Sequence, residues 1–270
     1  MKIKHWSLRR QISFGVFILV TSIMIALISL VGLKSRTALV DQAITSQDNQ
    51  VSILASQLDT TYDSILRNTV RLANTFHGLY SEPLVFHPEK TVRVGSYSSA
   101  LVTHNNTQVN LNFDYVDKFS QMTGGNATVF IRYQDDFLRV TTSLKNQQGK
   151  RATGTLLGKG HPGYQLLING EMFIGEAKLF GVDYMTQYTP VLNQSGDVIA
   201  IYYVGFPIST LLKQLRENLL EAKFGTLGYA SLVFNHNNKS FSGKLLADPT
   251  YSGQQLAKSY SDEYYKEILN

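Results

Sequence analysis

The chain has 270 residues, no cysteine and a formal net charge of +5. The absence of cysteine excludes disulfides, thiolate zinc sites and cysteine nucleophiles. Four of the basic residues, Lys2, Lys4, Arg9 and Arg10, precede the first apolar stretch, so the rest of the chain is close to neutral and lacks the concentrated basic face of a nucleic-acid-binding protein.

An uncharged apolar stretch runs from Ile12 to Leu33. At about 1.5 Å rise per residue, a helix of this length crosses a hydrocarbon core of about 30 Å. The basic residues 1–11 favour a cytoplasmic amino terminus and an extracytoplasmic location for residues 34–270. The alternative is a cleaved signal peptide, but its apolar run is shorter, roughly 7–15 residues, and it ends in a small-x-small site that residues 29–36 lack. We therefore predict an uncleaved single span in the cell membrane.

From Lys34 to Gly78 the sequence predicts one long amphipathic helix, in which apolar residues recur at spacings of three and four. Neither proline nor glycine occurs between Lys34 and His77, so the membrane helix is expected to continue directly into this one. Such a helix could transmit a displacement of the outer domain to the membrane, and we expect two copies of the chain to pair along it. The alternative is a helix that only packs on a sheet.

The residues after Gly78 predict an α+β domain. Proline and glycine predict an irregular passage over residues 83–95, a turn at residues 104–106 and a short helix over 115–122 that ends before Gly124. A further short helix is expected over residues 161–169. Strands are predicted at 127–133, 137–144, 172–180, 183–192 and 198–206. Residues 211–222 predict a helix that either links two modules or packs on the same sheet.

Several blocks of sequence carry a resemblance: residues 136–145 (DFLRVTTSLK), 151–155, 161–164, 175–190 and 204–206. In order and spacing they resemble the Cache 3/Cache 2 fusion sensor domain of bacterial methyl-accepting chemotaxis proteins. The resemblance implies a PAS-like antiparallel sheet on the long helix, which binds a small molecule outside the cell and signals across the membrane. It also implies that residues 34–210 form the first sensor module. Residues 211–270 would then be a linker helix and the incomplete start of a second module of a longer receptor.

Alternate side chains of a strand point to opposite faces of the sheet, and this separates a candidate site from the core. In the strand from Asp136, we assign Leu138, Val140, Thr142 and Leu144 to the helix-backed core. The face opposite this core carries arginine, tyrosine and threonine side chains. Arginine can form two parallel hydrogen bonds to a carboxylate and tyrosine provides an aromatic wall, so this face suits a small anionic or zwitterionic organic ligand. The alternative is the solvent-exposed face of a half-buried sheet. The candidate ligand-binding residues are Arg139, Thr141, Lys178, Tyr184, Thr186, Tyr188 and Tyr203.

Two functions of different classes follow from these observations. The first is the ligand-sensing domain of a chemotaxis receptor, with a sensor histidine kinase or a cyclase as alternative output. The second is a membrane-anchored extracytoplasmic enzyme, but we find no histidine pair at metal-ligand spacing and no G-x-S-x-G nucleophile elbow. Gly154, Gly158 and Lys159 also depart from the spacing of a phosphate-binding loop. We therefore expect a non-enzymatic sensor without metal or cofactor.

Overall fold

The computed structural model describes residues 7–221, 232–234 and 244–247. The chain divides into two compact units, Met1–Gln57 with Lys223–Ala230, and Leu58–Ala222 with Ser231–Asn270. Of residues 211–270, predicted to form a linker helix and the start of a second module, 222–231, 235–243 and 248–270 lie outside the described residues. The described part of that region comprises helix α4 (Ser209–Glu221) and an antiparallel pair of strands, β9 (Leu232–Phe234) and β10 (Lys244–Ala247).

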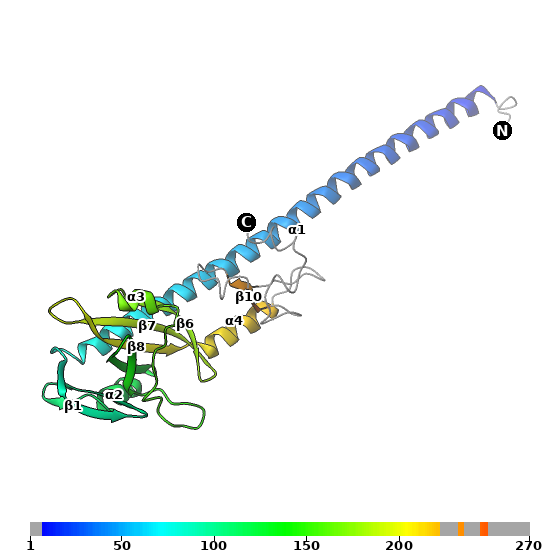
Figure 1. Ribbon diagram of the computed structural model, residues 1–270. Helices are drawn as coiled ribbons and strands as arrows, with labels where there is room; N and C mark the ends of the chain where they lie inside the picture. Colours follow the sequence, from blue (N-terminus) through cyan, green and yellow to red (C-terminus); the bar gives the residue numbers. More distant parts are fainter. Residues whose placement is uncertain (1–6, 222–231, 235–243, 248–270) are drawn as a thin grey trace. The chain divides into compact units, whose positions relative to one another are not determined.

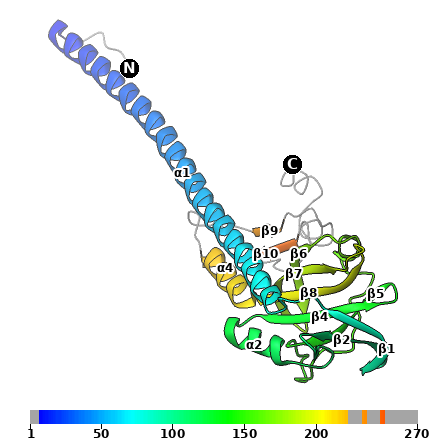
Figure 2. The same ribbon diagram turned by 90° about the vertical axis from the view of Figure 1, so that its left-hand side faces the viewer.

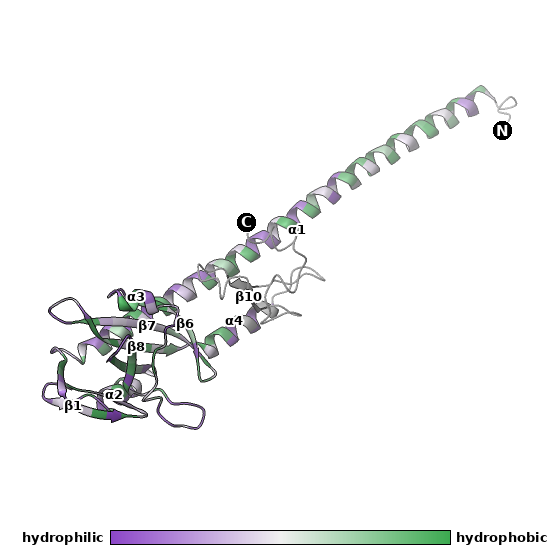
Figure 3. Cartoon of the chain, viewed as in Figure 1, coloured by the Kyte–Doolittle hydropathy of each residue, from purple (hydrophilic) through white to green (hydrophobic). Residues whose placement is uncertain are grey.

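Helix α1 extends without interruption from Leu8 to Gly78 (Figure 1), so the predicted continuity of the apolar and amphipathic segments is confirmed. Its amino-terminal part, in the first unit, is long and apolar enough to cross a membrane, and none of its most apolar stretch is buried. Figure 3 shows hydrophobic residues predominating there. These properties are compatible with a membrane protein.

The second unit contains a five-stranded antiparallel sheet with strand order β5-β4-β8-β7-β6. All five strands lie where the sequence predicts them, so the α+β fold is confirmed. Their bounds are β4 (Asn126–Tyr133), β5 (Asp136–Thr142), β6 (Phe173–Leu179), β7 (Val182–Leu192) and β8 (Val198–Pro207).

A smaller antiparallel sheet comprises β1 (Val85–Val94), β2 (Tyr97–His104) and β3 (Thr107–Gln108). The prediction of an irregular passage over residues 83–95 is therefore wrong. Pro88 is accommodated because β1 is an edge strand and its register shifts between His87 and Thr91. The predicted turn is confirmed, since Asn105 and Asn106 have φ angles of 49° and 61°, as a two-residue hairpin turn requires.

One face of the five-stranded sheet packs against α1 and α2 (Asp114–Thr123), with α2 visible beside the sheet in Figure 2. Phe76 near the end of α1 lies at the centre of this core, with its ring centroid 5.3 Å from Phe119 of α2 and 5.8 Å from Tyr202 of β8. The strands contribute alternate residues, as predicted for Leu138 and Val140. The other residues that the five-stranded sheet contributes to this core are Ala127, Val129, Ile131, Ala200, Tyr202 and Val204.

The opposite face is also covered, by α3 (Tyr164–Ile168) and by the segment 151–158. This segment follows the edge of β5, where Arg139 N–H donates to the Thr155 carbonyl and Gly154 N–H donates to the Arg139 carbonyl, both at 2.9 Å. Its backbone also touches the β1–β2 turn, because a Cβ on Gly154 would lie 2.9 Å from the Cα of Gly95. Because both faces are covered, the central strands are almost continuously hydrophobic, and the alternative of a solvent-exposed face is wrong.

Candidate functional site

A β-bulge in β5 decides which of its side chains face the candidate site. Arg139 pairs with Phe130 of β4, whereas Thr141 pairs with the preceding residue, Val129, so Val140 is the extra residue. Phe130 belongs to the cluster under α3, and Val129 belongs to the α1-backed core. Arg139 therefore points to the α3 face and Thr141 to the opposite one.

The bulge separates Thr141 from the other predicted ligand-binding residues. Its hydroxyl donates to the Asn112 carbonyl at 2.5 Å, on the side of α2. Thr142, which we assigned to the helix-backed core, lies instead on the Arg139 side, with its hydroxyl 2.6 Å from that of Thr128. The alternation used for the prediction holds up to Val140 and reverses after it, because one inserted residue turns the following side chains over.

Lys178 also lies apart from the cluster. It pairs across the β6–β7 hairpin with Asp183, and its Nζ lies 3.1 Å from an Asp183 carboxylate oxygen. Asp183 precedes Tyr184 in β7, so the two point to opposite faces. The side chain of Lys178 is 66% exposed, which is consistent with a solvated ion pair rather than a place in a buried site.

The structure brings together the other five predicted residues, Arg139, Tyr184, Thr186, Tyr188 and Tyr203. Tyr188 pairs directly with Tyr203 across β7 and β8, with ring centroids 4.9 Å apart. None of the five is more than 7% exposed. Thr186 donates its hydroxyl to the Gly175 carbonyl at 2.6 Å, and Tyr184 accepts a hydrogen bond from the Asn126 amide at 3.2 Å.

Arg139 is a buried cation without a counter-ion in the described part of the chain. Its Cζ lies 4.8 Å from the centroid of the Phe130 ring, and its Nε is buried without a hydrogen-bond partner. Burial lowers the pKa of Arg139, an effect that the neighbouring Tyr188 and Tyr203 partly offset. An uncompensated charge in such a place is unfavourable, and an anion would relieve it.

Tyr203 carries a second unsatisfied polar atom, since its buried hydroxyl has no hydrogen-bond partner among the described residues. Its phenol ring lies over Gly205, where a Cβ would overlap the ring, so glycine two residues on makes the space for it. Burial raises the pKa of Tyr203, and burial raises that of Tyr188 to about 12 although Arg139 acts in the other direction. Both phenols are therefore protonated at neutral pH and can donate hydrogen bonds.

Sequence reasoning missed His161, whose ring centroid lies 4.6 Å from that of Tyr188 and 5.3 Å from that of Phe173. Burial lowers the pKa of His161 to about 4, so the ring is neutral. Its Nδ1 accepts a hydrogen bond from the Gly163 N–H at 3.1 Å, which places the proton on Nε2. The signal was present, because His161 and Pro162 belong to one of the blocks that carry the family resemblance.

The cluster thus combines one guanidinium with neutral phenol and imidazole groups among aromatic rings. It offers donors for a carboxylate and a neutral aromatic wall, and Arg139 has no acidic partner there. No group of three or more histidine, aspartate or glutamate side chains within the described residues is placed to hold a metal ion.

Comparison with known proteins identifies the domain. Among solved structures, the chain is similar to the periplasmic sensory domain of the Campylobacter jejuni chemoreceptor Tlp1, with 13% identity, coverage of 80% of this chain and 78% of that chain, and a TM-score of 0.41. The chain is also similar to a protein of Rhodococcus sp. RHA1 described as a transcriptional regulator, with 12% identity and a TM-score of 0.27. The match covers 36% of this chain and only 57% of the length of the Rhodococcus protein. The C-terminal domain of the E. coli transcriptional regulator KdgR matches with 15% identity, a TM-score of 0.21 and coverage of 38% and 83%.

No curated protein matches the chain. The sequence profile of the Cache 3/Cache 2 fusion domain matches residues 35–270. Since this match covers most of the chain, the protein belongs to the Cache 3/Cache 2 fusion family of sensor domains.

Proposed function

We propose that the protein is the extracytoplasmic ligand-sensing part of a transmembrane chemoreceptor, and that it binds a small organic carboxylate or amino acid at Arg139. The observation that carries this proposal is the buried guanidinium without an anion. In a folded domain such a charge either has an ion-pair partner or binds a charged ligand. The family supports a sensor role, because Cache domains are sensor folds.

In the proposed complex, the ligand carboxylate accepts hydrogen bonds from Arg139 and from the phenol of Tyr203. Both donors have an unpaired atom in the structure, so the ligand satisfies groups that are otherwise buried without partners. The rings of Tyr188 and Phe130 would lie beside the ligand body. A charge-assisted hydrogen bond to a buried group contributes about 1.5–3 kcal/mol, so loss of the guanidinium should weaken binding by at least tenfold.

The test is a thermal-shift screen of the full chain in neutral detergent micelles with organic acids and amino acids, in the wild type and two variants. A ligand that binds only the folded state raises its melting temperature. Arg139→Gln should abolish the shift. The matched control is Arg132→Gln on the neighbouring strand, because Arg132 also lies over an aromatic ring, with its Cζ 5.1 Å from the centroid of Phe137. Unlike Arg139, it is partly exposed and its Nε donates a hydrogen bond to the Gln134 carbonyl at 2.7 Å. Equal shifts in the wild type and Arg139→Gln would contradict the proposal.

The proposed topology places the amino terminus in the cytoplasm and the Cache domain outside. Alkaline phosphatase, which is active only outside the cytoplasm, should be active when fused after Glu221 and inactive when fused after Arg10. The reverse result would contradict the orientation inferred from the basic residues 1–11.

We further propose that two copies pair along α1 and that ligand binding shifts the population of two arrangements of this pair. Within the first unit, α1 exposes apolar side chains beyond the predicted span, among them Leu39, Val40, Ile44 and Val51, all at least half exposed. The chain has no native cysteine, so a single Ile44→Cys substitution gives an unambiguous cross-linking site. Oxidation in membranes should yield a covalent dimer for Ile44→Cys and much less for Gln42→Cys, which lies on the other side of the helix. Equal yields would contradict pairing through this face.

A further inference from the structure

A pocket lies on the other side of the five-stranded sheet from Arg139, where α1 ends. It is formed by the last turn of α1, the segment 79–84 and the hairpin between β7 and β8, all within the second unit. Its volume is about 510 Å³, within the range of about 300–1,000 Å³ typical of small-molecule sites. The ligand site proposed at Arg139 does not include this pocket.

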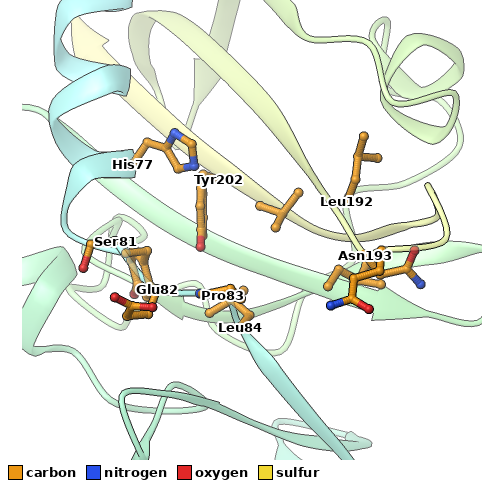
Figure 4. A pocket seen from close by; sticks show the side chains of 12 residues that line it. His77, Ser81, Glu82, Pro83, Leu84, Leu192, Asn193 and Tyr202 are labelled. Carbon is orange, nitrogen blue, oxygen red and sulfur yellow. The ribbon is translucent and has the colours of Figure 1, made fainter.

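The walls of this pocket combine aromatic and aliphatic surface. The ring of Tyr202 stacks on that of Tyr80 with centroids 4.9 Å apart, and His77 of α1 lies 5.4 Å from Tyr202. Tyr202 and Tyr80 are nearly buried, at 4% and 5% exposure, so they form the floor. Pro83, Leu84 and, from the β7–β8 hairpin, Asn193 also line the pocket (Figure 4).

The charge of the pocket is one-sided. Of the described residues that line it, Glu82 alone is an aspartate, glutamate, lysine or arginine. Its carboxylate has no ion pair in the described part of the chain, and its backbone N–H donates to the Nε2 of the buried His104 at 3.3 Å, which fixes the segment that carries it. The pocket also lies at the carboxyl end of α1, where the helix dipole favours a positive charge.

We propose that this pocket binds a small organic ammonium ion. The cation would pair with Glu82 and lie against the electron-rich face of Tyr202, and its alkyl part would contact Pro83 and Leu84. An anion would meet the Glu82 carboxylate without a compensating cation, so it is excluded. A ligand here contacts the final turn of α1 directly, so the domain would receive a second input, of opposite charge to the first, on the helix that leads toward the predicted membrane span.

The experiment is isothermal titration of the full chain in maltoside micelles with choline and with n-butylammonium, and with n-butyrate and 1-butanol as probes of matched size. Saturable binding of either cation, with no binding of butyrate or butanol at this pocket, is expected. Glu82→Gln should weaken cation binding by about two- to fivefold, the loss of one exposed charge contact. The matched control Glu89→Gln removes an exposed carboxylate on β1 and should change the affinity less than twofold.

Glu82 is exposed, so its substitution should not unfold the domain, and Gln194→Trp at the exposed hairpin turn provides a second variant that adds bulk at the rim of the pocket without changing its charge. It should also weaken cation binding. Organic acids that stabilise the protein through Arg139 should do so equally in Glu82→Gln, which separates the two sites. Absence of saturable cation binding, an unchanged affinity in Glu82→Gln and Gln194→Trp, or preference for butyrate would each overturn the proposal.

Discussion

Replacing Arg139 by methionine tests whether the guanidinium is there for stability or for a ligand. A buried Nε without a partner destabilises the folded state by about 1–3 kcal/mol, and the substitution removes this cost. It also removes the contact with the Phe130 ring at 4.8 Å, which contributes about 1–2 kcal/mol where water is excluded. Methionine occupies a similar volume as an apolar chain. The free energy of unfolding should therefore change by between about −1 and +2 kcal/mol.

This expectation differs sharply from that for a paired arginine, whose loss costs about 3–5 kcal/mol when a buried partner remains. A change of 1 kcal/mol shifts the melting temperature of a domain of this size by about 2–4 °C. Arg139→Met should therefore melt within about 4 °C below and 8 °C above the wild type, whereas a paired arginine would give a fall of about 6–20 °C. Near-ultraviolet circular dichroism of the buried tyrosines follows the unfolding of this region. A fall of more than about 10 °C without ligand would refute the reasoning.

Three further predictions concern the surroundings of the cluster. Gly205→Ala forces a methyl group against Tyr203 and should lower the free energy of unfolding, measured in urea titrations, by about 1–3 kcal/mol. The double variant Gly205→Ala/Tyr203→Phe should recover part of this loss, and full stability of Gly205→Ala would be inconsistent with the packing. His161 has a folded pKa of about 4 against roughly 6.5 in the unfolded chain, so its contribution to stability is complete above about pH 6.5 and is lost as the pH falls toward 4. His161→Gln should reduce this loss of stability in thermal melts, and an unchanged pH profile would argue against burial of the neutral ring. Asp117→Asn removes the charge and one of the two oxygens that accept hydrogen bonds from Arg151, at 2.6 and 2.7 Å, and keeps the other. It should lower the free energy of unfolding by about 1–2 kcal/mol, and no change in the urea midpoint would contradict a role for this pair.

Most of the fold could be predicted from local signals. Gly78 ends α1, and Gly124 adopts the left-handed conformation, with φ of 71°, that ends α2. The strands are recognisable because their residues favour extended structure and are bounded by turns. The strand β1 was missed because Pro88 and Gly95 resemble a loop signal, and only the pairing with β2 shows that the proline lies at an irregularity of an edge.

The candidate site could be predicted only in part. Alternation shows which side chains of one strand share a face of the sheet, but not which faces of two different strands lie on the same side. The bulge at Val140 moves Thr141 away, and nothing in the local sequence marks it. The displacement of Lys178 could have been foreseen. A two-residue turn at Phe180 and Gly181, with φ of 52° and 89°, pairs Leu179 with Val182 and hence Lys178 with Asp183.

The segment that runs along the edge of β5 limits how a solute could reach Arg139. It is tied to the strand by several backbone hydrogen bonds and touches the β1–β2 turn at Gly95, so displacing it would break these contacts together. The side of α3 is held more lightly, by the packing of Leu167 and a bond from the Tyr164 hydroxyl to the Asp135 carbonyl. Exchange with bulk water should therefore depend on small movements of α3. In the proposed complex, the dissociation rate set there would determine how quickly the domain follows a falling ligand concentration.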